Sequence, residues 1–205
     1  MRNNERKLMN FLVNKIVCAI GCVAKDNNSK LNAKHIAFAA MALALAVATS
    51  MIKVIKLPMG GSVTLFSMLF IVLIGYWYGI KTGLTAALAY GVLQLLLDPY
   101  ILNIPQVLLD YILGFGALGL SGIFSNSKHG LIKGYIVGVI GRFICSFLSG
   151  WIFFAVYTPE FFNSAILYSI VYNGSYIGLE AAVTLVVISL PPVNKSLAYV
   201  KNNLV

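Results

Sequence analysis

Charged residues are scarce in this sequence, and their scarcity excludes an ordinary soluble domain. Only 10% of the 205 residues are charged, six of them acidic, whereas 60% are hydrophobic. A soluble domain of this size needs a polar surface that such a composition cannot supply. Long apolar runs with few charges indicate a chain surrounded by lipid. The length suits one compact helical bundle rather than several domains.

The motifs of common catalytic, nucleotide-binding and metal sites are missing as well. The sequence contains no Gly-x-Ser-x-Gly, no His-Glu-x-x-His and no phosphate-binding P-loop, so we expect neither an enzyme nor ATP hydrolysis by this chain. The cysteines, Cys18, Cys22 and Cys145, are odd in number and form no Cys-x-x-Cys pair. We therefore predict no disulfide framework, no metal site and no cofactor.

A net charge of +9 could indicate a nucleic-acid-binding protein, so the positions of the charges must be considered. The basic residues concentrate in segment 1–34 and in alternate gaps between apolar runs, whereas the predicted outer loops hold only Lys53 and Lys56. This pattern is typical of the charges that set membrane topology, with basic segments inside. We expect no nucleic-acid binding, and we place both termini in the cytoplasm.

The apolar runs predict an all-α integral membrane bundle of six transmembrane helices. The expected spans are 35–52, 62–78, 84–97, 104–124, 133–156 and 164–190, with Pro191-Pro192 ending the last. The membrane domain that these spans form, 35–190, is followed by a predicted cytoplasmic tail, 191–205. Segment 1–34 is basic and predicted to be cytoplasmic or to lie on the membrane surface. Its short apolar run, 16–24, leaves a cleaved signal peptide as the alternative.

Three ionisable residues fall at membrane depth, where such groups are costly and therefore informative. Measured from the outer helix ends at about 1.5 Å per residue, Asp110 lies roughly 9 Å deep, Arg142 roughly 21 Å and Glu180 roughly 24 Å. The similar depth of Arg142 and Glu180 predicts a structural ion pair. Asp110 is left without an obvious protein partner, although the long side chain of Arg142 could reach upward and share it. An unpaired carboxylate near the outer surface favours a cation.

Aromatic and amide side chains share the predicted depth of Asp110. Tyr100 and Tyr111 lie near it in sequence, and Tyr168 and Asn173 lie in the outer part of the last span. A second set follows one face of the fifth span at four-residue spacing: Ser146, Gly150 and Phe154. An anionic group beside aromatic rings suits a flat organic cation, and an asparagine can pair with a heterocycle. The alternative is that the tyrosines form an interfacial belt.

Four motifs resemble the thiamine-specific S-components of energy-coupling factor (ECF) transporters. They are GGSVTLFSM at 60–68, YILNIPQVLLDY at 100–111, RFICSFLSGWIFF at 142–154 and YSIVYNGSY at 168–176. The resemblance covers about 35–190. It implies a six-helix bundle that captures thiamine from outside with high affinity and works with a membrane coupling subunit and two ATPase subunits.

The resemblance also implies roles for individual residues. Asp110 is the acidic residue near the thiazolium ring, with Tyr100, Tyr111, Tyr168 and Asn173 as pocket residues. Phe154 stands where an aromatic residue stacks on the ligand, and Gly150 gives it room. Two positions depart from the family pattern: Ser146 replaces a histidine, and Leu65 stands where some members carry a glutamate.

The first span is rich in alanine, and small residues let another helix approach closely in lipid. The resemblance implies that small residues of this span contact the coupling subunit. Ala37 matches one of them, but Met41 stands at the second position. Ala40 and Ala44 are then expected to serve instead. The alternative is packing within the bundle.

Three other functions stay open on the sequence alone. One is an S-component for a thiamine precursor, such as hydroxymethylpyrimidine, or for another vitamin. A second is a membrane-embedded enzyme that uses Asp110 and Glu180 as acid and base. The third is a purely structural scaffold.

Overall fold

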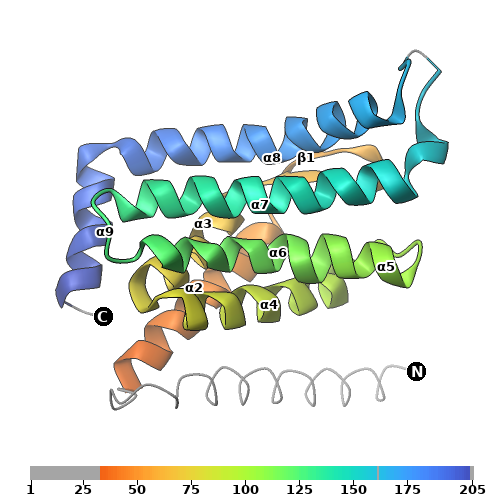
Figure 1. The fold of residues 1–205 in the computed structure, drawn as a ribbon. Coiled ribbons are helices and arrows are strands. Elements are labelled where there is room, and N and C mark those ends of the chain that lie inside the picture. Colours follow the sequence, from red (N-terminus) through yellow and green to blue (C-terminus); the bar gives the residue numbers. More distant parts are fainter. Residues whose placement is uncertain (1–32, 161, 204–205) are drawn as a thin grey trace, which may run out of the picture.

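The computed structural model describes residues 33–160 and 162–203 of the chain. Most of the long helices run along a common axis (Figure 1). The β-hairpin lies toward one end of this axis and the last helix, α9, lies at the other; we call these the hairpin end and the α9 end. Residues 1–32 lie outside the described residues, and with them nearly all of the segment predicted to be cytoplasmic or surface-lying.

Five helical segments of the described residues are long and apolar enough to cross a membrane. They are α2 (Ala33–Ser50), α4 (Ile80–Leu97), the composite segment Ile104–Phe124, α7 (Gly130–Phe153) and α8 (Ala165–Ser189). A sixth apolar helix, α3 (Ser67–Tyr78), is shorter. The predicted fold class of a helical membrane bundle is confirmed, with each predicted span matched by one of these six segments.

The second span is wrong at its start, because residues 62–64 form a strand. Strand β1 (Lys53–Lys56) pairs antiparallel with β2 (Ser62–Thr64), and the short helix η2 (Pro58–Gly60) lies in the turn between them. Gly60 has a φ of 89°, a conformation that side chains disfavour. The turn and the β-branched residues of β2 favour a hairpin over a helix.

The hairpin leaves α3 too short to reach the hairpin end of the bundle. Twelve helical residues rise about 18 Å, against the roughly 30 Å of a hydrocarbon core. The helix begins after Phe66, which has a φ of 63°. The hairpin folds over the space beyond Ser67, and a pocket opens there.

Toward the α9 end, glycines allow the helices to pack closely. Gly79, with a φ of 84°, makes the sharp turn between α3 and α4. A Cβ on Gly83 would lie 2.7 Å from the Cα of Gly75, and a Cβ on Gly119 would lie 2.6 Å from the backbone of Leu84. Such distances exclude any larger residue, so α3, α4 and the segment around Gly119 pack backbone to backbone.

The composite segment 104–124 changes its helical geometry along its length. It starts as α5 (Ile104–Val107), widens to the π-helical segment η3 (Leu108–Leu113), returns to α6 (Gly114–Gly116) and tightens to the 3-10 helix η4 (Ala117–Phe124). Asp110 lies in the π-helical segment, and such segments occur frequently at functional sites.

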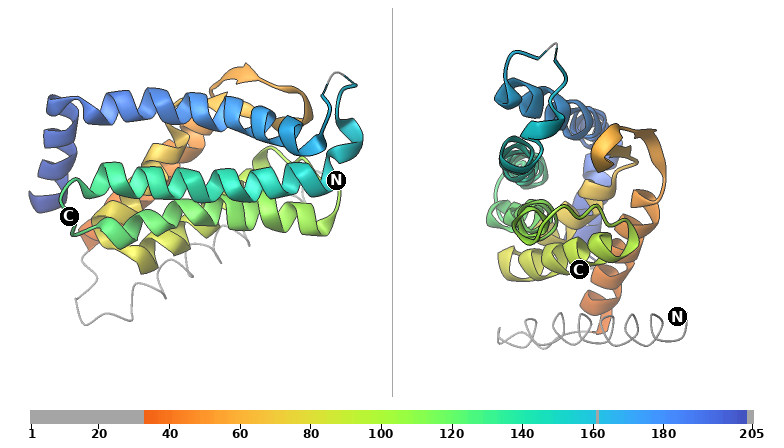
Figure 2. Two further views of the ribbon diagram at one scale, coloured as in Figure 1. Left: turned by 45° about the horizontal axis from the view of Figure 1, so that its top comes forward. Right: turned by 90° about the vertical axis from the view of Figure 1, so that its right-hand side faces the viewer.

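The third span, the fifth span and the tail differ in detail from the prediction. The third span begins at Ile80 rather than at residue 84. The fifth span begins earlier, at Gly130, and its predicted end belongs to the separate short helix η5 (Ala155–Tyr157). The tail after Pro191 forms α9 (Pro191–Asn203), which crosses the end of the bundle (Figure 2). Lys201 of α9 donates to the carbonyl of Ser125 and lies 4.1 Å from the ring centre of Tyr76.

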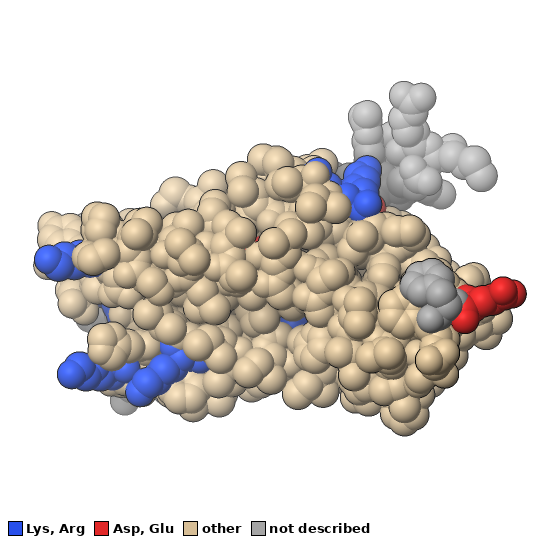
Figure 3. Space-filling model, turned by 90° about the horizontal axis from the view of Figure 1, so that it is seen from above, with Lys and Arg blue, Asp and Glu red and all other residues tan. Residues whose placement is uncertain are grey.

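Charged side chains are sparse in the middle of the bundle on the face that Figure 3 shows, where only small traces of blue and red are visible. Blue lysine and arginine side chains gather at the α9 end and beside the hairpin, and red acidic atoms mark the tip of the hairpin end. The broad uncharged zone between them fits a lipid-facing surface.

Candidate functional site

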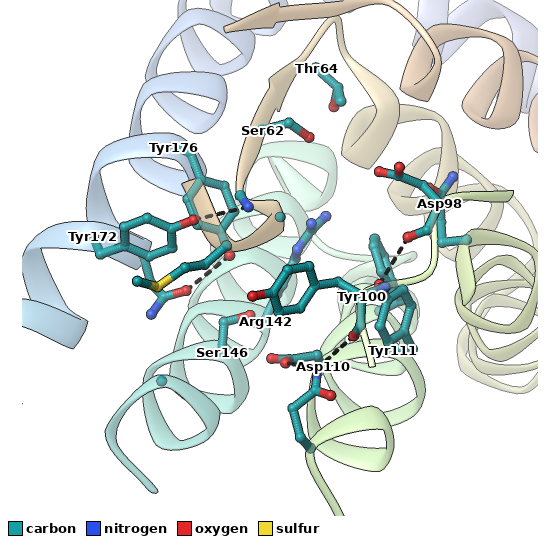
Figure 4. Close-up of a pocket in the computed structure, with 18 of the residues that line it drawn as sticks. Ser62, Thr64, Asp98, Tyr100, Asp110, Tyr111, Arg142, Ser146, Tyr172 and Tyr176 are labelled. Atoms are coloured by element: carbon teal, nitrogen blue, oxygen red, sulfur yellow. Dashed lines mark hydrogen bonds between the residues drawn. The ribbon is translucent and has the colours of Figure 1, made fainter. Parts of the chain in front are cut away.

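A pocket opens between the hairpin, the composite segment, α7 and α8 (Figure 4). It encloses about 130 Å³. All eight residues that the sequence predicted as ligand-binding line this one pocket: Tyr100, Asp110, Tyr111, Ser146, Gly150, Phe154, Tyr168 and Asn173. They come from segments more than 70 residues apart in sequence. Helix depth predicted only that these residues lie at similar levels in the membrane, and the fold brings them into one pocket.

Asp110 is held by two neutral hydrogen-bond donors. The side-chain nitrogen of Gln106 and the hydroxyl of Ser149 both donate to its Oδ2, each at 2.7 Å. Among the described residues, no hydrogen bond reaches the other oxygen, Oδ1. Both donors are buried. The carboxylate is thus oriented by the protein but keeps one oxygen available within the pocket.

Gln106 also ties the loop before it to the pocket wall. Its Oε1 accepts from the backbone of Leu102 at 3.1 Å, and its Nε2 lies 3.2 Å from the carbonyl of Tyr100. Asn103 caps the helix by accepting from the Gln106 backbone at 2.8 Å. The sequence reading missed Gln106 and Ser149 because neither is charged, although Gln106 stands four residues before Asp110, the spacing of helical neighbours.

Two predicted tyrosines and a phenylalanine form the wall near the hairpin end. The hydroxyl of Tyr111 accepts from the Tyr100 backbone at 2.8 Å and donates to the carbonyl of Asp98 at 3.0 Å. The rings of Tyr100 and Phe154 stack with centres 5.8 Å apart and an interplanar angle of 26°. Tyr111 therefore fixes the loop that presents Tyr100, and Tyr100 extends the aromatic face of Phe154.

A tyrosine ladder on α8 faces the hairpin. Tyr168 lies 3.8 Å from the sulfur of Met59, and the hydroxyl of Tyr172 donates to the carbonyl of Pro58 and accepts from the Gly61 backbone at 3.0 Å. Tyr176 continues the ladder at the same four-residue spacing and also lines the pocket. The sequence reading named only Tyr168, although the repeat itself could have indicated all three.

Asn173 and Gly150 lie in the pocket wall, where each also makes contacts within the protein. The Asn173 amide donates to the carbonyl and hydroxyl of Ser169, at 3.0 and 3.2 Å, and accepts from Tyr176 at 2.9 Å. A Cβ on Gly150 would lie 2.3 Å from the Ser169 hydroxyl. Gly150 therefore lets α7 and α8 approach, and Asn173 joins neighbouring side chains on α8.

The predicted ion pair of Arg142 with Glu180 is wrong. Glu180 accepts from the backbone and hydroxyl of Thr64, at 3.2 and 2.7 Å, from the hydroxyl of Ser67 at 3.2 Å and from the backbone of Met68 at 3.3 Å. These donors come from β2 and the first turn of α3, which the sequence reading placed inside a continuous helix. Similar depth had suggested the pair, but depth does not determine which way a side chain faces.

Arg142 instead lines the pocket and lies over an aromatic ring. Its guanidinium carbon is 4.2 Å from the ring centre of Phe115, a cation–π contact. The ion pair that the described residues do form is at the pocket mouth, between Lys53 of the hairpin and Asp98 of the loop after α4.

The chemistry of the pocket is that of binding. Within the described residues no group of three histidine, cysteine, aspartate or glutamate side chains could hold a metal ion. Glu180 is not among the residues that line the pocket, and its carboxylate is already bonded on both oxygens. An acid–base pair of Asp110 and Glu180 therefore does not face a common substrate.

Comparisons with known proteins identify the family. Residues 36–199 match the thiamine transporter protein family. The chain is 32% identical to the thiamine transporter ThiT of Bacillus subtilis (strain 168) over 136 residues, which cover 60% of this chain and 70% of that protein. It is 26% identical to the thiamine transporter ThiT of Lacticaseibacillus paracasei over 129 residues, 55% of this chain and 64% of the relative.

The fold also has a solved counterpart. The structure of ThiT from Listeria monocytogenes superposes with a TM-score of 0.61 at 24% sequence identity, covering 76% of this chain and 93% of that one. The membrane bundle, the pocket and the family match over most of the chain agree with one another, and the chain belongs to the thiamine transporter protein family.

Proposed function

We propose that this chain is the thiamine-binding S-component of an ECF-type uptake transporter in the bacterial plasma membrane. It captures thiamine from outside with high affinity and delivers it together with a coupling membrane subunit and two ATPase subunits. The family match and the two curated relatives named as thiamine transporters support the ligand.

The observation that carries the proposal is the environment of Asp110. Its carboxylate is fixed through Oδ2, presents Oδ1 in the pocket and lies among the rings of Tyr100, Tyr111 and Phe154. Thiamine carries a permanent positive charge on a flat thiazolium ring. A preorganised carboxylate beside aromatic faces supplies both attractions that such a ring can use.

The distribution of basic residues supports a proposal for the side of the membrane that the pocket faces. The pocket opens toward the hairpin end, where β1 carries Lys53 and Lys56. At the other end, α9 and the turn before α7 carry Lys128, Lys195 and Lys201. By the positive-inside rule the α9 end is cytoplasmic and the pocket faces outward. Both termini are then cytoplasmic.

The partner surface is proposed on α2. Ala37, Ala40 and Ala44 are exposed on one face of this helix, whereas Ala39 and Ala42 are buried against the bundle. Exposed small residues at helical spacing allow close approach of another membrane helix. The coupling subunit is the proposed occupant.

The test is calorimetric titration of the purified chain with thiamine, without ATP and without other subunits. Saturable binding at micromolar ligand or below supports the proposal, and its absence in protein shown to be folded contradicts it. Hydroxymethylpyrimidine, which lacks the thiazolium charge, is titrated in parallel. Tighter binding of this precursor than of thiamine would reassign the ligand within the same class.

The partner proposal has its own matched pair of variants. Ala40→Leu enlarges the exposed face of α2 and is expected to reduce copurification with the coupling subunit while leaving thiamine affinity unchanged. Ala39→Leu enlarges the buried face and is expected to lower stability instead. Equal loss of thiamine binding in both would place Ala40 in the packing of the bundle.

A further inference from the structure

Arg142 is a half-buried cation with one shielded donor nitrogen that has no acceptor among the described residues. Its Nη1 is shielded from solvent and has no hydrogen-bond partner, and no hydrogen bond to any atom of its guanidinium is formed within residues 33–160 and 162–203. A guanidinium carries five N–H donors. A shielded N–H group of a charged side chain that has no acceptor is costly at membrane depth. A ligand that places an acceptor beside Nη1 would therefore be bound more favourably.

Arg142 lines the pocket, so a ligand there can reach its guanidinium. Figure 4 shows its side chain projecting from α7 into the pocket. Arg142 precedes Ser149, the donor to Asp110, by seven residues of one helix, so it lies roughly 10 Å closer to the α9 end. The pocket thus has a carboxylate at one level and a guanidinium near its floor.

We infer that Arg142 is a second subsite, which donates to a neutral hydrogen-bond acceptor on the inward end of the ligand. It thereby fixes the direction of the ligand, with the cationic ring at Asp110 and the acceptor end at the floor. The inference rests on the proposed function and names the chemistry of the part of the ligand that Asp110 does not contact. In thiamine, the ring nitrogens of the aminopyrimidine are acceptors of this kind.

Charge decides between a neutral and an anionic acceptor. Ser67 and Thr64, which line the pocket near its floor, both donate to Glu180, so a negative charge already stands directly behind them. A phosphate or carboxylate at the floor would meet this charge as well as Asp110. A neutral acceptor avoids that repulsion and still satisfies the guanidinium, while Phe115 holds the guanidinium in place from one face.

The test is a cycle of two ligands and two forms of the protein. The ligands are thiamine and an analogue in which a benzyl group replaces the aminopyrimidinylmethyl group, which keeps the thiazolium charge and removes the acceptors. The proteins are the wild type and Arg142→Gln, with Arg142→Lys as a variant that keeps a charge. Affinities are measured by calorimetry on folded protein, and thermal unfolding is recorded for each.

We expect wild-type protein to prefer thiamine over the benzyl analogue by about 10–100-fold, the range for a hydrogen bond to a charged group. The preference is expected to fall below about threefold in Arg142→Gln and to be intermediate in Arg142→Lys. A purely structural arginine would weaken both ligands equally and leave the preference unchanged, which would overturn the inference.

The outcomes separate this inference from the proposed function. If wild-type protein binds thiamine and both variants keep the full preference, only the role of Arg142 is refuted. If folded wild-type protein does not bind thiamine, the proposed function itself fails. If Arg142→Gln does not fold, the preference in Arg142→Lys decides, since an unchanged value there also refutes the subsite. A wild-type preference near one refutes it without any variant.

Discussion

Asp110 and Glu180 are acidic side chains inside the same bundle, and their surroundings differ in one respect that separates their roles. Glu180 accepts hydrogen bonds on both oxygens, from β2 and the first turn of α3. Asp110 accepts on Oδ2 alone and turns Oδ1 to a pocket. A carboxylate whose lone pairs are all used stabilises the fold, whereas one oriented through a single oxygen can still bind a ligand. Burial and charge therefore do not by themselves distinguish a structural carboxylate from one that can bind a ligand. The hydrogen bonds to each carboxylate oxygen make that distinction.

Removing the Glu180 carboxylate is expected to have the largest effect. Glu180→Ala leaves the buried hydroxyl of Ser67 and the donors of Thr64 without their acceptor, which should lower the free energy of unfolding by about 3 kcal/mol or more. Thermal unfolding in detergent measures this. Glu160→Ala is the matched control, because Glu160 is exposed in the loop before α8. Equal stability of the two variants would remove the distinction between the two carboxylates.

Asp110→Asn keeps the shape of the side chain and removes its charge. Thiamine affinity is expected to fall by about 2–5 kcal/mol, the range for breaking a buried charge pair, with little change in unfolding temperature. Calorimetry with thiamine and with neutral hydroxymethylpyrimidine measures the contrast. The neutral ligand should be weakened far less, and an equal loss for both would argue against Asp110 as the counter-ion.

The donors to Asp110 sharpen the comparison further. Ser149→Ala and Gln106→Ala each remove one hydrogen bond from Oδ2 and free the carboxylate to turn. Each should weaken thiamine by about tenfold, the lower end for a hydrogen bond to a charged group. Ser175→Ala is the control, because Ser175 is exposed and donates only to the backbone of its own helix. Wild-type affinity in both donor variants would mean that Asp110 needs no orientation.

The smallest effect is expected at the pocket mouth. Lys53 and Asp98 join the hairpin to the loop that presents Tyr100, but the Asp98 side chain is 55% exposed. Lys53→Met should therefore cost less than about 1 kcal/mol and raise the dissociation rate of thiamine by less than about fivefold. Stopped-flow measurements at low and high salt test this, since added salt should reduce the difference from wild type.

Hydropathy predicted the spans well because lipid demands long apolar helices. It failed at residues 62–64, since these residues directly precede the apolar residues of α3 and hydropathy averaged over a window does not detect a turn between the two. The pocket residues were found from charge and from family motifs. Gln106 and Ser149 were missed because an uncharged donor becomes significant only when its acceptor is known. The Arg142–Glu180 pair failed because two helices at the same depth can turn their side chains to different neighbours.

The π-helical segment η3 is a place where an evolutionary insertion or deletion can alter the pocket. A π-helical turn contains one residue more than an α-helical turn, and η3 separates the residues around Asp110 from the glycine contacts of η4. The π-helical geometry therefore offsets the rotational register of the residues around Asp110 from that of η4. Gain or loss of a single residue within 108–113 would rotate the binding half by about a quarter of a turn and leave the glycine contacts in place. Ligand preference could in this way diverge between descendants of one ancestor without rebuilding the rest of the bundle.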